Sequence, residues 1–120
     1  MNARWLNVRT LRAAWWTHRA LHQVRMELRT KGLQYSTAPG PPRLPSSAQR
    51  GVLGVLRRER STCLERALVL QRWHQSQGDV RDVVVAVKGP AIDFAAHAWL
   101  DGDTDGEAGV FSELLRLPPR

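Results

Sequence analysis

Apolar side chains recur at steps of three or four residues from about Asn7 to Lys31, which is the spacing of one face of an α-helix. The pattern therefore predicts a long amphipathic helix over this segment. Gly32 is well placed to end the helix, and Arg29 and Lys31 suit the negative end of its dipole. The stripe expected to be buried consists of Val8, Leu11, Trp15, His18, Leu21, Val24 and Leu28.

The next segment is rich in proline. Residues Thr37 to Ser47 contain four of the seven prolines, which excludes a helix or a central strand and favours an extended connector. A short helix is predicted after it, from Ala48 to Arg58, although Gly54 weakens the helical pattern. Its apolar side is expected to comprise Val52, Leu53, Val55 and Leu56.

A helix start is marked by the sequence Thr62-Cys63-Leu64-Glu65. It has the form of a capping box, with Thr62 as the N-cap and Glu65 three residues later. The apolar positions continue to Trp73, and Gly78 supplies a stop. This assignment puts Cys63 at the first position of the helix.

Three strands are predicted after Gly78. The segment Asp82 to Lys88 is a near-continuous run of β-branched residues and indicates a buried strand. A second strand is expected from Phe94 to Asp101 and a third from Gly109 to Leu117, with turn-forming residues between them. Helices followed by strands indicate an α+β fold, with N-terminal helices packed on a small antiparallel β-sheet.

The length of the chain bounds its organisation. A chain of 120 residues is expected to form one domain, in which residues 1–47 hold the first helix and the proline-rich connector and residues 48–120 form the core. No apolar run approaches the roughly 20 residues needed to span a bilayer, and the Met1 end lacks the apolar region of a signal peptide. A cytoplasmic location without membrane association is therefore expected.

The charge favours an anionic partner. The chain carries 18 basic and 11 acidic residues, a net charge of +7. The arginines are spread along the chain, and there is no zinc finger, RNP motif or basic stripe with interleaved aromatic residues, so nucleic-acid binding is not expected. An acidic peptide, or a protein with an acidic face, suits this charge.

Cys63 is the only cysteine, so it cannot form an internal disulfide. With four scattered histidines it makes no recognisable zinc set, and neither a metal nor a cofactor is expected. At a helix start, unpaired backbone N–H groups and the positive end of the helix dipole favour a nucleophilic thiolate, and they can also hold an oxyanion. The alternative is that Cys63 is a small buried apolar residue.

A nucleophilic thiol needs a base, and His97 is the candidate. It lies 34 residues after Cys63, in the alternating sequence Phe94-Ala95-Ala96-His97-Ala98-Trp99, and it is the only histidine in the predicted sheet. The other histidines, His18, His22 and His74, lie on predicted helices and are expected to be structural.

The string Cys63-Leu64-Glu65-Arg66-Ala67-Leu68-Val69-Leu70, together with Phe94-Ala95-Ala96-His97-Ala98-Trp99-Leu100, resembles the transglutaminase-like peptidases of lasso-peptide biosynthesis. These are the leader peptidases, the stand-alone peptidase half of the split B protein. The resemblance covers roughly Ser61 to Asp101. It implies a transglutaminase- or papain-like cysteine peptidase core that removes the leader from a ribosomally made precursor through a thioester on Cys63.

The resemblance also implies partners for this reaction. In this family the short peptidase works with a small leader-binding protein that delivers the precursor peptide. A separate lasso cyclase would then use the amine that the cleavage releases.

The family's third catalytic residue is an aspartate about a dozen residues after the histidine, but that spacing falls on Gly109 here. If Thr104-Asp105-Gly106 is a three-residue hairpin loop, Glu113 is expected opposite His97 on the neighbouring strand. Glu113 is therefore ranked first as the third residue, Asp103 second and Asp101 third. Asp101 shares a face with His97 but lies about 13 Å away along the strand.

Three further questions stay open. Trp99 shares a strand face with His97 and is expected either to line the substrate pocket or to lie in the core. The same Cys-His-acid set also serves acyl transfer of the transglutaminase kind. A non-catalytic module, in which the helix carrying Trp5, Trp15 and Trp16 holds a peptide or protein, is the remaining alternative.

Overall fold

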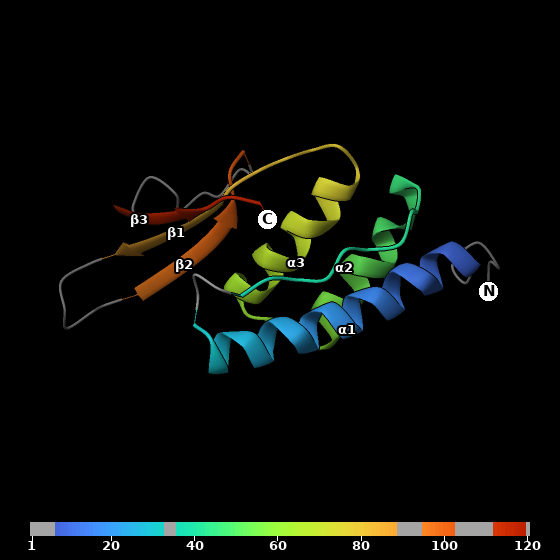
Figure 1. Cartoon of the computed structure of the whole chain (residues 1–120), viewed down its shortest axis with the longest axis horizontal. Coiled ribbons are helices and arrows are strands. Elements are labelled where there is room, and N and C mark those ends of the chain that lie inside the picture. Colours follow the sequence, from blue (N-terminus) through green and yellow to red (C-terminus); the bar gives the residue numbers. More distant parts are fainter. Residues whose placement is uncertain (1–6, 33–35, 89–94, 103–111, 120) are drawn as a thin grey trace.

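The computed structural model describes residues 7–32, 36–88, 95–102 and 112–119. The helices come first and pack beside the sheet that follows them, as Figure 1 shows. This arrangement confirms the α+β prediction. The elements are α1 (Val8–Thr30), η3 (Ser46–Ala48), α2 (Gln49–Arg58), α3 (Cys63–Ser76), β1 (Val83–Lys88), β2 (Ala95–Leu100) and β3 (Ser112–Leu117). None of the described helices is long and apolar enough to cross a lipid bilayer.

The described sheet is antiparallel, in the order β2-β1-β3. β1 takes the central place because its residues from Val83 to Ala86 are all buried, so both of its faces are covered. The expected hairpin between the second and third strands is therefore wrong. Each of these two strands pairs with β1 and not with the other.

The first helix has the predicted extent but a different buried face. Its C-terminal end is confirmed: Gly32 adopts φ +84° and its N–H donates to the Glu27 carbonyl at 3.1 Å. In the first half, however, Val8, Leu11 and Trp15 are exposed. The buried positions of α1 are Thr10, Ala13, Trp16, Thr17, Ala20, Leu21 and Val24.

Small residues explain this rotation of the buried face. α1 packs mainly on α2, and Gly51 of α2 lies directly against the α1 backbone. A Cβ atom on Gly51 would overlap the carbonyl oxygen of Thr10 and would come within 3.1 Å of the Ala14 nitrogen. The two helices approach so closely at Gly51 that no side chain fits between their backbones, while the larger Leu11 and Trp15 stay outside.

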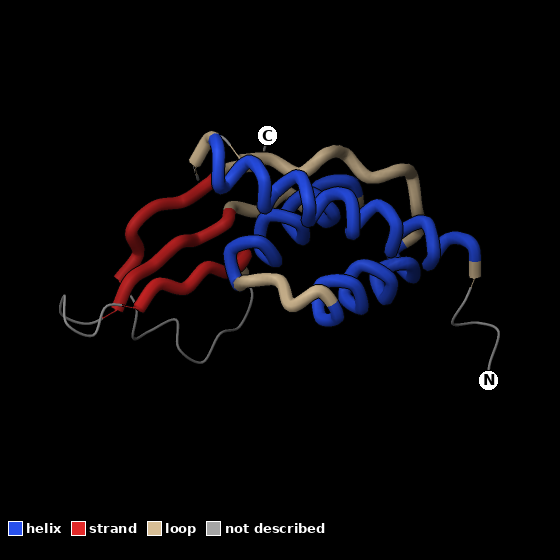
Figure 2. Tube along the Cα trace, turned by 90° about the horizontal axis from the view of Figure 1, so that it is seen from below, coloured by secondary structure: helices blue, strands red, loops and turns tan. Residues whose placement is uncertain are grey.

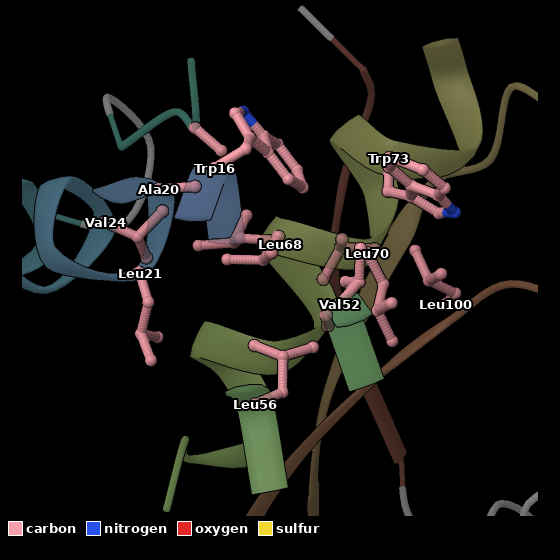
Figure 3. Close-up of a cluster of buried hydrophobic side chains, with 14 of the residues drawn as sticks. Trp16, Ala20, Leu21, Val24, Val52, Leu56, Leu68, Leu70, Trp73 and Leu100 are labelled. Atoms are coloured by element: carbon pink, nitrogen blue, oxygen red, sulfur yellow. The ribbon is translucent and has the colours of Figure 1, made fainter. Parts of the chain in front are cut away.

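α3 lies at the centre of the molecule. It contacts α1 on one side and β1 and β2 on the other. Figure 3 shows apolar side chains of all three helices gathered around it. The ring centroids of Trp16 of α1 and Trp73 of α3 lie 6.0 Å apart. Gln71 is buried and donates to the carbonyls of Arg81 and Leu117 at 2.9 and 2.8 Å, which joins α3 to the start and the end of the sheet region.

The proline-rich connector is extended, as predicted, and runs along the helices as the long tan loop of Figure 2. Hydrogen bonds attach it to α1. The Trp16 indole N–H donates to the Pro39 carbonyl at 3.1 Å, and the Gln23 amide donates to the Thr37 carbonyl at 3.2 Å. The connector therefore packs as part of the helical layer.

Candidate active site

Cys63 is the first residue of α3, as the capping pattern predicts. The Glu65 N–H donates to Thr62 Oγ1 at 3.2 Å, and Glu65 Oε1 accepts from the Thr62 N–H at 2.9 Å. These reciprocal bonds confirm the capping box. The Cys63 side chain is exposed, so the alternative of a buried structural cysteine is wrong.

A tight turn leads from α2 to this cysteine. The Ser61 N–H donates to the Leu56 carbonyl at 3.1 Å and the Arg60 N–H to the Arg57 carbonyl at 3.2 Å. Arg60 adopts φ +53°, the left-handed conformation that ends a helix in this motif. The turn therefore fixes the direction in which the chain enters α3 at Cys63.

Arg25 of α1 holds both ends of this turn. Its Nη2 donates to the Glu59 carbonyl at 2.8 Å, and its Nε donates to Glu65 Oε1 at 3.1 Å. Glu65 is therefore a capping residue, as the capping box predicts, and it also forms an ion pair with Arg25. Sequence reasoning does not identify Arg25, because the partners lie 34 and 40 residues away and no local pattern links them.

His97 lies on β2, where it pairs with Ala86 of β1. Its ring lies 5.4 Å from that of Trp99, with an angle of 31° between the planes, which confirms that the two side chains share a strand face. Both are half-buried. The place of Trp99 in a substrate pocket stays a prediction.

The helix that carries Cys63 packs on the strand that carries His97, but no hydrogen bond links these two described side chains. α3 packs on β2, and Figure 1 shows α3 beginning on the side of the helical layer that faces the sheet. The side chains of Ala98 and Leu100 point into the core that α3 shares. Because successive side chains of a strand point to opposite faces, His97 lies on the other face of β2. Among the described residues, Cys63 and His97 form no hydrogen-bonded pair.

The position of β2 leaves His97 at an edge of the described sheet. β2 is an edge strand of the described sheet, so no further described strand separates His97 from the space beside β2. The dyad of Cys63 and His97 stays a prediction.

The three carboxylates ranked for the third position have different surroundings. Glu113 of β3 pairs with Ala86, which also pairs with His97 on its other side. The expected direct pairing of Glu113 with His97 is therefore wrong, and their backbones lie two strand spacings apart, about 10 Å. A register shift in the β1–β3 ladder between Val85 and Ala86 falls beside Glu113.

The other two carboxylates lie at the end of β2. Asp101 is exposed and accepts a hydrogen bond from Arg116 Nη1 at 2.9 Å, so its carboxylate already has a cationic partner. Asp103 lies outside the described residues. The choice of the third catalytic residue stays a prediction.

Comparison with known proteins agrees with the fold. No curated protein and no solved structure shows significant similarity to the chain. The sequence model of the Transglutaminase-like superfamily matches residues 5–110, which is most of the chain and includes both Cys63 and His97. This protein therefore belongs to the Transglutaminase-like superfamily.

Proposed function

We propose that the protein is a cysteine peptidase that removes the leader from a ribosomally made lasso-peptide precursor. The family match supports acyl chemistry on a cysteine. The observation that carries the proposal is the exposed thiol of Cys63 at the capped start of α3. The Ala-His-Ala-Trp sequence on β2 is the feature that the chain shares with the leader peptidases of this family.

The proposed reaction proceeds in two steps. The Cys63 thiolate attacks the scissile carbonyl, and the backbone N–H groups at the start of α3 stabilise the oxyanion of the tetrahedral intermediate. Protonated His97 gives its proton to the departing amine of the core peptide, which leaves the leader as a thioester on Cys63. Water then attacks the thioester, neutral His97 takes up its proton, and the leader carboxylate and the thiolate are released. The reaction takes place in the cytoplasm, where the precursor is made.

The third catalytic residue in this proposal is a carboxylate that orients the His97 imidazole. Glu113 keeps the first rank because it and His97 pair with the same residue, Ala86, from the two sides of β1. Asp103 stays second. Asp101 stays last because Arg116 already binds its carboxylate.

The test is cleavage of a precursor peptide by purified variants, followed by mass spectrometry. We expect Cys63→Ala and Cys63→Ser to abolish release of the core peptide, because neither side chain forms a thioester. His97→Ala should lower the rate by a factor of about 100 or more. His74→Ala is the matched control, because His74 is a half-buried histidine on the opposite end of α3, and it should cleave normally.

Cleavage at the normal rate by Cys63→Ala, with the fold checked by circular dichroism, would refute the peptidase proposal. The same assay separates hydrolysis from acyl transfer. With an added primary amine, a peptidase yields the free leader acid, whereas a transferase yields the leader amide, which has a different mass. If the leader amide predominates, the chain is an acyltransferase that uses the same nucleophile.

The proposal also includes the small leader-binding protein as a partner. A groove of about 800 Å³ lies between the first half of α1 and residues Pro39 to Pro42 of the connector. Val8, Leu11 and Trp15 line it and are exposed, and Arg12 and Arg19 add positive charge to its wall. An apolar groove with basic residues suits a partner that presents apolar and acidic side chains.

A further inference from the structure

Two histidines and one carboxylate meet on the surface near the turn before Cys63. His18 and His22 lie one turn apart on α1, and Glu59 follows the last residue of α2. His18 Nδ1 lies 3.0 Å from Glu59 Oε2, and His22 Nε2 lies 3.8 Å from Glu59 Oε1. We propose that these three side chains form a binding site for a divalent transition-metal ion such as Zn²⁺.

The spacing of the ligand atoms fits such an ion. The three ligand atoms all lie within 4.8 Å of one another. Tetrahedral zinc with bonds of 2.0–2.2 Å needs separations of about 3.4 Å between its ligand atoms. Small rotations of side chains on the surface are sufficient to reach this distance, since His18 and His22 are 43% and 60% exposed.

The backbone already holds the three ligands in place. The i, i+4 spacing of His18 and His22 presents both rings on one side of α1, the arrangement that helical zinc sites use. The Glu59 N–H donates to the Val55 carbonyl at 2.9 Å, and its carbonyl accepts from Arg25 at 2.8 Å. Trp15 stacks on the His18 ring at 5.8 Å between centroids, which restricts its orientation.

Open space lies beside the two histidines, where a further ligand such as water can reach an ion that they bind. A shallow cavity of about 330 Å³ covers the two histidines and is lined by Trp15, His18, Arg19 and His22. Three protein ligands with an open position are the usual set of an exchangeable zinc site, in which water completes the coordination. The two imidazole ligands favour zinc, copper or nickel over magnesium.

The neighbouring charges limit the affinity. Arg19 lines the same cavity, and the guanidinium group of Arg25 donates a hydrogen bond to the main-chain carbonyl of Glu59. The charge of Arg25 is partly balanced by its ion pair with Glu65. We therefore expect micromolar and not nanomolar binding.

Metal binding would connect two parts of the fold. His18 and His22 belong to α1, whereas Glu59 lies in the turn that ends four residues later at Cys63. A bound ion would therefore add a bond between α1 and the turn that carries the nucleophile. The site is distinct from Cys63 and does not depend on the proposed peptidase function.

The test is titration of the full chain with zinc chloride in the Cys63→Ser background, so that the thiol cannot act as a ligand. We expect one zinc ion per chain by isothermal titration calorimetry and a melting temperature several degrees higher at saturation. Magnesium chloride should give neither effect. His22→Ala and Glu59→Gln should each weaken zinc binding about tenfold or more.

His74→Ala is the matched control, because His74 also lies near a carboxylate, Asp79 at 3.9 Å, but belongs to no three-ligand cluster among the described residues. It should bind zinc with unchanged affinity. The proposal is overturned if the Cys63→Ser chain does not bind zinc. It is also overturned if His22→Ala, shown to be folded by circular dichroism, binds zinc as tightly as its parent.

Discussion

The residues around Cys63 form a small network of reciprocal contacts. Thr62 and Glu65 bond to each other's main chain, and Glu65 also pairs with Arg25 of α1. Because Cys63 is exposed and lies outside the buried core, its position depends on this cap. The network stabilises the start of α3 and directs its free N–H groups toward the space beside Cys63.

Replacing the cap tests this dependence. We expect Thr62→Ala to lower the free energy of unfolding by about 1 kcal/mol, because the Glu65 N–H loses its acceptor. The measurement is urea denaturation, in which the midpoint should fall while the slope stays the same. Thr62→Ser keeps the hydroxyl and serves as the control. An unchanged midpoint for Thr62→Ala would contradict the role of the cap.

At the scale of elements, the crossing of α1 and α2 sets the shape of the helical layer. The close approach depends on Gly51, where the backbones leave no space for a side chain. The crossing also determines which face of α1 is buried, and so it leaves Trp15 outside the core while Trp16 is buried.

Two glycines of α2 provide a matched pair. Gly51→Ala should destabilise the protein by about 1–3 kcal/mol, because the added methyl group overlaps the Thr10 carbonyl and pushes the helices apart. Gly54 is exposed, and a Cβ atom added there would meet no atom within 4 Å, so Gly54→Ala should stabilise the helix by about 0.5–1 kcal/mol. Thermal unfolding of both variants measures the difference, and equal melting temperatures would disprove this account of the crossing.

At the scale of the whole molecule, the net charge of +7 and the groove beside α1 are the two features on which the proposed partner binding depends. In the proposed complex, long-range attraction would bring the acidic leader-binding protein to the surface, and the apolar groove would then provide the contact area. Since surface charges are screened by salt, association with the proposed leader-binding protein should slow as ionic strength rises.

Binding to that partner tests the groove. Trp15→Ala should weaken binding at least tenfold, because Trp15 is 63% exposed and supplies the largest exposed side chain on the groove wall. Met26→Ala is the control, since Met26 is 64% exposed on the same helix but lies outside the groove lining. The affinities can be measured by calorimetry, and equal losses in the two variants would exclude the groove as the docking surface.

Short-range patterns were sufficient to predict the helices, the strands and the position of the thiol. The reason is that the contacts involved join near neighbours: the cap of α3 lies within four residues, Gly32 and Gly78 end their helices with positive φ, and a β-branched run such as β1 favours extended backbone. The place of Cys63 at the start of α3 follows from such contacts alone.

Contacts between distant residues decided the rest. The burial of β1 on both faces put it between β2 and β3, which separated Glu113 from His97. The close crossing of α1 and α2 at Gly51 determined which face of α1 is buried. The packing of α1 against the turn after α2 brought His18 and His22 close to Glu59. Periodicity cannot reveal these arrangements, because the free energy of packing selects them only when the whole chain has folded.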